Sequence, residues 1–458
     1  MWSSSLRWLV LAGCNIVAPP AVPTPINSPT LVEPTGTKII SFFSTETDPK
    51  QIVVLQTLVA EYQHLNPNIE IDIILASPAS RGRRLLTALA SGADLGIFEI
   101  EPTLMIEWVK AGYLLPLDDV VSAIGVDDFV QGSVFSYQGH VYAVPYATSV
   151  YGLWVRTDLL AQAGLPLPTT YEQVLNAAAT LSQGEIYGIA LPGGQNIATA
   201  NYFSTFLWQN GGDYFTCDGQ VIFGQPKALE AVRNWVALAE YAPPGFTTWG
   251  YSEQIEAFLR GRVAMAMYAG RLGVHVADKA PELEDRITVV FPPWRTEKVT
   301  LGVWSRFAIA AGTHHKTEAK EFLQWLVSGD RLLRYDMTVP GHMIPPLRSV
   351  QAMALDFDSA YVSQHPDWLE AFDNWVSYTA HPAVNMGSIR DGRFIRSDVA
   401  PPWGSIVFGT PGIIDNMLQE ITLGERDPEA AWQDAVALIE QAREEWLAAH
   451  PDWEPPTY

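Results

Sequence analysis

The stretch "KIISFFSTETDPKQIVVLQTLVAEYQHLNPNIEIDIIL", residues 38–75, decides the fold, because it combines a strand, a helix and a second strand. Its first six residues are β-rich. Asp48 and Pro49 then supply an N-cap and a proline at the first helical position. Apolar residues follow at helical spacing as far as Asn66 and Pro67, and "IEIDIIL" alternates apolar with acidic residues as a strand does. We therefore predict a β–α–β unit.

The same alternation continues along the chain. "RLLTALASG" and "TLMIEWVKAG" have the pattern of helices, and "LGIFEI" between them has the pattern of a strand. Strands that alternate with helices predict a mostly parallel sheet covered on both faces, and such sheets bind ligands at the carboxyl ends of their strands. This rule selects Phe43 and Ser44 after the first strand, and Glu99 and Glu101 after the third. For the two glutamates, a place on the solvated surface is the alternative.

Composition limits the classes of protein to consider. With 458 residues, 48% of them hydrophobic and 17% charged, the chain is too long for one ordinary core and should form two or more globular units. Fifty acidic residues against 28 basic ones give a net charge of -22, and the densest basic cluster, residues 81–84, is short. We therefore expect no nucleic-acid partner. No apolar run reaches the eighteen or so residues of a membrane-spanning helix.

The N-terminus has the pattern of a lipoprotein signal. Arg7 precedes a short apolar run, and Leu11-Ala12-Gly13-Cys14 resembles the lipobox of bacterial lipoproteins, whose cysteine carries the lipid. We expect a signal peptide over residues 1–13, a tether rich in Pro and Thr over 14–37, and a lipid anchor at Cys14 on the extracytoplasmic face of the cell membrane. An ordinary buried cysteine in a short helix is the alternative, although the prolines that follow would end such a helix. If Cys14 is lipidated, Cys217 has no disulfide partner within the chain and is expected to have no chemical role.

Six longer segments, taken together, carry a resemblance to a known family. They occur in the order expected of extracellular solute-binding proteins of family 1, the maltose-binding-like receptors of ABC importers. The segments are "LLTALASGADLGIFEIEPTLMIEWVKAGYLLPLDD", "GHVYAVPYATSVYGLWVRTDLLAQAGLPLPTTYEQVLNAAATL", "YGIALPGG", "FLWQNGGDYF", "EAFLRGRVAMAMYAGRLG" and "FAIAAGTHHKTEAKEFLQWLVSGD".

The resemblance implies a two-lobed α/β fold of the periplasmic-binding-protein type. Each lobe is expected to contain a mostly parallel sheet flanked by helices, and several crossing strands are expected to form a hinge. The expected parts are residues 38–148 in lobe 1, 149–297 in lobe 2, 298–350 as a return to lobe 1, and 351–458 in lobe 2 and in helices beside the hinge. Pro145 separates two β-rich runs at the first crossing, where we expect it to interrupt the strand.

Aromatic residues suggest what the cleft binds. Sugar rings present C–H groups that pack on aromatic faces, and their hydroxyls need donors and acceptors at the rim of the site. Besides the residues selected by the strand-end rule, we expect ligand contacts from Ser149, Tyr151, Trp249, Tyr251, Tyr268, Arg271, Trp304, Arg306 and Trp403. For each aromatic residue the alternative is a buried core ring. Arg156 lies at a place where the family commonly has asparagine. Because arginine pairs with carboxylate and phosphate groups, an acidic or phosphorylated sugar remains an alternative ligand.

These residues and the resemblance predict a receptor and not an enzyme. We expect a lipid-anchored monomer that captures a sugar or oligosaccharide in the cleft and delivers it to an ABC permease, without metal or cofactor. A lipid-anchored ligand sensor is one alternative. An extracellular glycoside hydrolase, which would use two carboxylates, is another, but no nucleophile elbow, HExxH motif or Walker sequence is present.

Overall fold

A computed structural model describes residues 36–76, 78–100, 102–130, 132–216, 219–380, 386–390, 393–397, 401, 403–408 and 411–454. The chain divides into two units, residues 1–36 and 37–458, and every described helix and strand belongs to the second. Cys14, Glu101 and Cys217 lie outside the described residues. Within the described part, no helix combines the length and the apolar character that crossing a membrane would require.

The first strands form the predicted β–α–β units. β1 (Lys38–Ser44) pairs in parallel with β2 (Ile69–Leu75) and with β3 (Ile97–Ile100). Helix α1 (Pro49–Leu65) connects β1 to β2 and begins as predicted, because the Asp48 side chain accepts a hydrogen bond from the backbone N–H of Lys50 and Pro49 occupies the first turn.

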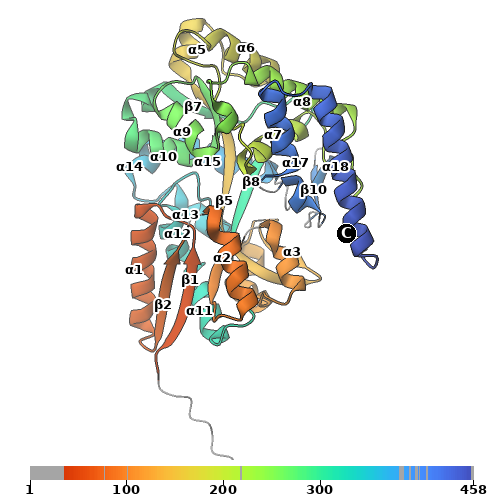
Figure 1. Ribbon diagram of the computed structural model, residues 1–458. Coiled ribbons are helices and arrows are strands. Elements are labelled where there is room, and N and C mark those ends of the chain that lie inside the picture. The colour runs from red at the N-terminus through yellow and green to blue at the C-terminus, as the bar shows by residue number, and fades with distance from the viewer. Residues whose placement is uncertain are drawn as a thin grey trace, which may run out of the picture. The chain divides into compact units, whose positions relative to one another are not determined.

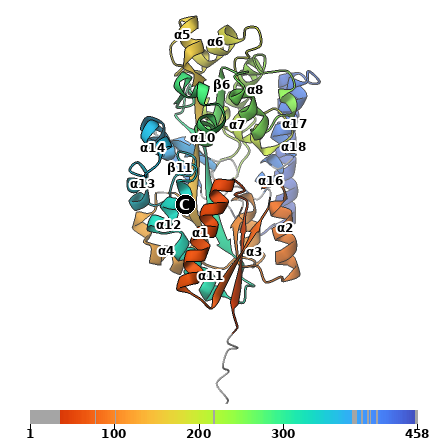
Figure 2. The ribbon, with the colours of Figure 1, turned by 90° about the vertical axis from the view of Figure 1, so that its left-hand side faces the viewer.

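Helices cover both faces of this sheet, as Figures 1 and 2 show. On one face α1 packs with α4 (Asp118–Ile124), α11 (Lys316–Leu326) and α12 (Gly329–Asp336). On the other face α2 (Pro78–Ser91) and α3 (Pro102–Lys110) pack against the side chains of Phe43 and Phe98. We call these elements lobe 1.

Two long strands connect this sheet to the second half of the structure. β5 (His140–Arg156) pairs first with β4 (Phe135–Tyr137) and β8 (Thr300–Ile309), and then with β6 (Met265–Ala269) and β7 (Ile287–Val290). In the described part of the chain, nine strands therefore form one sheet. The expected parallel pairing holds for β1, β2 and β3, but β5 and β8 run antiparallel because the chain leaves lobe 1 along β5 and returns along β8.

Pro145 does not interrupt β5, contrary to our expectation. The strand is continuous from His140 to Arg156 and absorbs the proline at a register shift between Pro145 and Ala147 in its pairing with β8. A proline has no N–H to donate to a sheet, so a bulge is where a strand between two neighbours tolerates it.

Lobe 2 surrounds the far half of β5 (Figure 1). Its helices include α9 (Tyr251–Leu259), which precedes β6, and α10 (Arg271–Lys279), which follows it. The others in this part of the chain are α5 (Thr157–Ala163), α6 (Tyr171–Leu181), α7 (Ile197–Gln209) and α8 (Pro226–Ala239). Thr170 caps α6 in a reciprocal pair of hydrogen bonds with Gln173.

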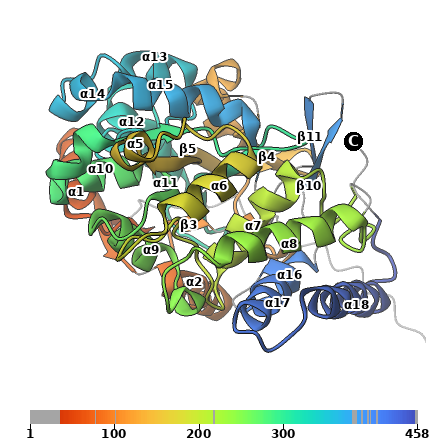
Figure 3. The ribbon, with the colours of Figure 1, turned by 90° about the horizontal axis from the view of Figure 1, so that it is seen from above.

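The C-terminal third of the chain contributes to both halves. Helix α13 (Arg348–Ala354) packs with lobe 1, whereas α15 (Pro366–Trp375), α16 (Gly404–Phe408), α17 (Ile413–Thr422) and α18 (Pro428–Ala449) pack with lobe 2. Figure 3 shows α16, α17 and α18 beside α7 and α8. Beyond four short 3-10 helices, the remaining described elements are α14 (Ala360–Gln364), β9 (Thr379–Ala380), which pairs with β8, and the hairpin of β10 (Met386–Arg390) and β11 (Arg393–Ser397).

Candidate ligand-binding site

Glu99 and the residues that follow β1 meet at the carboxyl ends of two parallel strands. The buried Glu99 carboxylate accepts hydrogen bonds from the Ser44 hydroxyl at 2.6 Å, from the Thr45 backbone N–H at 3.1 Å and from the Thr45 hydroxyl. Sequence reasoning had selected Ser44 and Glu99 by the strand-end rule, and the structure brings these two residues together. The hydroxyls hold the carboxylate in one orientation at this edge of the sheet.

Glu46 extends this group of acids toward lobe 2. Its side chain retains 22% of its exposure and lies 3.2 Å from the Arg271 guanidinium, whose side chain retains 16%. Burial and the neighbouring Glu99 raise the pKa of Glu46, and Arg271 opposes that shift. The pair joins the end of β1 in lobe 1 to the start of α10 in lobe 2, at a place that solvent reaches.

A third carboxyl group, Asp336 at the end of α12, lies deeper in lobe 1. It is fully buried, and neither of its carboxylate oxygens has a hydrogen-bond partner among the described residues. Burial, followed by the charge of Glu46, raises its pKa well above the ordinary value. We call Glu46, Glu99 and Asp336 the acid cluster.

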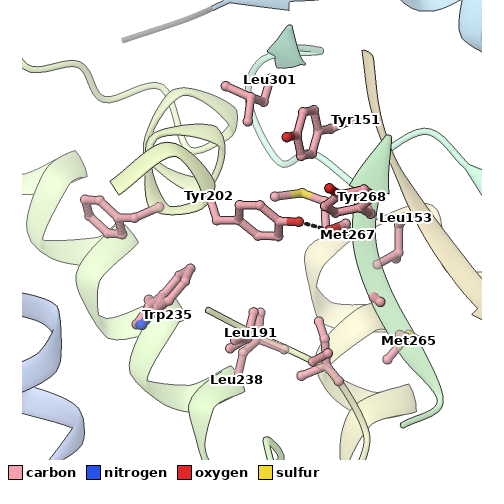
Figure 4. Close-up of a cluster of buried hydrophobic side chains, with 14 of the residues drawn as sticks. Tyr151, Leu153, Leu191, Tyr202, Trp235, Leu238, Met265, Met267, Tyr268 and Leu301 are labelled. Atoms are coloured by element: carbon pink, nitrogen blue, oxygen red, sulfur yellow. Dashed lines mark hydrogen bonds between the residues drawn. The ribbon is translucent and has the colours of Figure 1, made fainter. Parts of the chain in front are cut away.

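Four tyrosines lie together in lobe 2, and one of them, Tyr268, is close enough to Arg271 and Glu46 to interact with their charges. The ring centroids of Tyr268 and Tyr151 lie 5.6 Å apart, and Tyr202 lies 5.7 Å from Tyr151 and 6.1 Å from Tyr251. Figure 4 shows Tyr151, Tyr202 and Tyr268 together, with the hydrogen bond from the Tyr202 hydroxyl to the Met267 carbonyl oxygen. We call Tyr151, Tyr202, Tyr251 and Tyr268 the tyrosine cluster.

Polar contacts orient two of these rings. The Asn201 amide donates to the Tyr251 hydroxyl at 3.0 Å, and the Gln254 amide donates to the Tyr202 hydroxyl at 2.7 Å. Burial raises the pKa of Tyr268, and that of Tyr151 well above its ordinary value, so their hydroxyls remain neutral at physiological pH. Tyr202 is fully buried with its hydroxyl already hydrogen bonded, whereas Tyr251 keeps part of its exposure, so the edge of the cluster presents neutral hydroxyl groups beside acceptors from the acid cluster and donors from Arg271.

Three other predicted residues lie on the strands that cross between the lobes. Ser149 of β5 is partly exposed and pairs with Val303 of β8. Trp304 and Arg306 of β8 are buried, and the Arg306 guanidinium donates to the backbone carbonyls of Trp304 and Ser133 at 3.2 and 3.1 Å. The Arg306 side chain thus joins β8 to the loop that precedes β4.

The structure separates the remaining predicted residues from both clusters. Phe43 is buried in the core between the sheet and α2. Trp403 is fully buried, with its ring centroid 5.3 Å from that of Trp453. Trp249 lines a different cavity, on the outer side of α9. Arg156 was the residue that suggested an acidic sugar as an alternative ligand, and its side chain donates two hydrogen bonds to Asp158 at 2.6 and 2.7 Å.

Sequence reasoning missed several members of the site. Glu46 follows Ser44 by two residues, so the strand-end rule could have found it. Tyr202, Asn201 and Asp336 lie within helices and carried no local signal, because only the packing of α7 and α12 brings them to the clusters. Among the described residues, no three His, Cys, Asp or Glu side chains are grouped as metal ligands would be.

Comparisons with known proteins agree with this architecture. The mannitol-binding protein of Pseudomonas aeruginosa is 28% identical over 60% of this chain and 66% of its own length. The maltotriose-binding protein of Pyrococcus abyssi is 23% identical over 87% of this chain and 80% of its own.

Solved structures match over nearly the same span. Maltose-bound MalE3 of T. maritima has a TM-score of 0.74 at 19% identity, covering 88% of this chain and 99% of that one. The D-mannitol complex of an ABC transporter solute-binding protein from Agrobacterium vitis has a TM-score of 0.70 at 19% identity, covering 89% and 99%. The expected two-lobed α/β fold is thereby confirmed. The family model of bacterial extracellular solute-binding proteins matches residues 48–329, and the chain belongs to that family.

Proposed function

We propose that this protein binds a neutral sugar or sugar alcohol between the acid cluster and the tyrosine cluster. The observation that carries the proposal is the contact of Arg271 with Glu46, since it brings the two clusters together across the lobes. A polyol has many hydroxyls, and each needs a donor or an acceptor when it leaves water. Carboxylates, a guanidinium and tyrosine hydroxyls supply both.

Charge favours a neutral ligand. Arg271 is already paired with Glu46, and the Glu99 carboxylate lies nearby at the end of β3. A phosphate or carboxylate on the ligand would have to displace Glu46 from that guanidinium, whereas a neutral hydroxyl need not. The names of two relatives, a mannitol-binding and a maltotriose-binding protein, support a polyhydroxylated ligand.

Binding would favour the closed arrangement of the lobes. A ligand that contacts Glu46 of lobe 1 and Tyr268 of lobe 2 interacts fully only when the lobes are together, so it shifts the population toward that state. In our proposal the closed receptor, a monomer, delivers its ligand to an ABC permease. A diacylglycerol anchor at Cys14 holds it at the extracytoplasmic face of the membrane.

Calorimetry with mannitol, ribitol, maltose and maltotriose tests the proposal. We expect saturable one-to-one binding of at least one of these ligands to the full-length chain. Arg271→Ala should weaken that binding about tenfold to a hundredfold, because a hydrogen bond from a charged donor contributes about 1.5 to 3 kcal/mol. Tyr251→Phe keeps the ring and removes the hydroxyl, so it should cost less.

Arg233→Ala is the matched control. Arg233 is a lobe 2 arginine paired with an exposed glutamate, Glu429, and this variant should bind like the wild type. Equal loss of affinity in both arginine variants, or no binding of any of the four ligands, would contradict the proposal.

Release of reducing sugar during the titration would identify a glycoside hydrolase instead. Transport by a reconstituted permease would separate an importer component from a sensor.

A further inference from the structure

We propose that the outer face of α9 forms a second carbohydrate site, built on Trp249 and separate from the acid and tyrosine clusters. A cavity of about 390 Å³ lies there. Its lining contains none of the four clustered tyrosines and includes Tyr187, Pro243, Pro244, Trp249, Glu253 and Glu256. The volume lies within the usual range of small-molecule sites.

Helix α9 separates the two sites because its two faces carry different residues. Tyr251, Gln254 and Phe258 recur at helical spacing on the inner face, where Tyr251 belongs to the tyrosine cluster and Phe258 is fully buried. Glu253 and Glu256 recur on the outer face and line the cavity.

Trp249 forms a fixed aromatic wall of this cavity. Its side chain is partly exposed, and its backbone carbonyl accepts hydrogen bonds from the Gly194 N–H at 3.0 Å and from the Asn196 side chain at 3.1 Å. A Cβ added to Gly194 would lie 2.9 Å from the Thr248 carbonyl carbon, so the two segments are already in close contact. The backbone that carries the Trp249 ring is therefore already ordered and loses little conformational entropy when a ligand stacks on the ring.

The rest of the lining has the chemistry of a sugar site. Pro243, Pro244 and Tyr187 extend the apolar surface beside Trp249. Carboxylates and guanidinium groups stand around it: Glu256 lies 3.4 Å from Arg260, and Glu253 accepts a hydrogen bond from the Gly250 N–H at 2.8 Å. The C–H face of a pyranose packs on such a flat apolar wall, while its hydroxyls reach acceptors and donors at the rim.

This site does not depend on the proposed function of the clusters. It lies on lobe 2 alone, so lobe closure is not needed to form it, and its open side exposes a bound ring to water. We therefore expect weak binding, with dissociation constants on the order of 0.1 to 1 mM. Such a site would retain a longer oligosaccharide at the protein surface.

Saturation-transfer NMR with maltotriose and mannotriose tests this inference on the full-length Arg271→Ala protein, in which the cluster site is impaired. We expect transfer to the sugar protons of at least one trisaccharide in that protein. Adding Trp249→Ala should weaken the binding at least tenfold. Adding Glu256→Gln, a change at the cavity rim that leaves the wall intact, should weaken it about threefold. In the wild-type background, Trp249→Ala should leave the calorimetric affinity of the cluster site unchanged.

Three results would overturn the inference. One is the absence of saturable transfer from either trisaccharide. Another is transfer that persists undiminished in the Trp249→Ala and Glu256→Gln proteins. The third is binding of an apolar dye, anilinonaphthalene sulfonate, that depends on Trp249 and that neither trisaccharide displaces, since this would identify the cavity as an apolar site. A failure of cluster-site binding in the wild type contradicts the proposed function alone.

Discussion

Asp213 lies in the loop after α7, and its hydrogen bonds compensate only in part for the solvation that its carboxylate loses on folding. The Tyr214 N–H at 2.8 Å and the Trp208 indole N–H at 3.2 Å donate to the same carboxylate oxygen, yet burial raises the pKa of Asp213 to about 7. A carboxyl whose pKa is raised in the folded state binds more protons folded than unfolded. The free energy of unfolding therefore falls as pH rises from about 4 to about 7.

Asp213→Asn should remove this pH dependence while keeping an oxygen for both donors. We expect the variant to be more stable than the wild type at pH 8 by about 1 to 2 kcal/mol, a value reduced for the partial exposure of the side chain. At pH 4 the two proteins should unfold alike. Urea denaturation at both pH values measures the difference, and a variant that is less stable at pH 8 would show that the charged carboxylate is favoured in the fold.

Single residues of the site were predictable from the sequence where their position at the end of a strand selects them. They were not predictable where only the packing of distant elements brings them to the site. Ser44 is the last residue of β1 and Glu99 lies near the end of β3, so the strand-end rule found them. Trp403 and Tyr268 were selected for the same reason, as aromatic residues that could contact a sugar, but the structure buries Trp403 against α18. Periodicity and residue type do not distinguish a ring in a core from a ring beside a cleft, because both are largely buried.

At the scale of elements, β5 is packed so closely that its Gly152 has no room for a side chain. A Cβ at this position would lie 2.4 Å from a Val289 methyl group on β7 and 2.9 Å from the Trp375 ring on α15. Gly152→Ala should therefore lower the free energy of unfolding by about 1 to 3 kcal/mol, as overpacked cores do.

Gly312→Ala is the control for this substitution. Gly312 has no atom within 4 Å of its added Cβ, so the change should be close to neutral. Thermal denaturation of both variants measures the contrast. Equal melting temperatures would mean that β7 and α15 shift aside without cost, and that β5 is not a rigid connection between the lobes.

The elements themselves were largely predictable because their signals are local. Asp48 caps the helix that it was expected to begin, and Thr170 and Asp427 cap α6 and α18 in the same way, each through its own side-chain oxygen. The antiparallel course of β5 and β8 was not predictable from periodicity, since pairing direction depends on partners far along the chain. The prediction that Pro145 interrupts the strand was wrong for the same reason. The bulge that accommodates this proline forms in the pairing with β8, which lies far along the chain.

At the scale of the second unit, two ion pairs between described residues join lobe 1 to lobe 2. Arg271 meets Glu46 beside the clusters, and the Lys50 ammonium on α1 meets the Asp278 carboxylate on α10 at 2.7 Å. One pair connects α10 with the loop between β1 and α1, and the other connects α10 with the first turn of α1, so moving α10 away from this part of lobe 1 would break both. The first pair belongs to the proposed ligand site, whereas the second tests lobe closure without touching a ligand.

Charge reversal at the second pair should change ligand affinity indirectly. Lys50 and Asp278 retain 58% and 45% of their side-chain exposure, so their attraction is worth at most about 1 kcal/mol and is screened by salt. Lys50→Asp places two carboxylates together and disfavours closure, which should weaken the binding of the calorimetric ligand about threefold to tenfold at low ionic strength. Adding Asp278→Lys restores an opposite-charge pair and should return the affinity to the wild-type value. If the double variant binds as weakly as Lys50→Asp alone, the attraction between α1 and α10 does not contribute to closure, and Arg271 with the ligand would have to hold the lobes together.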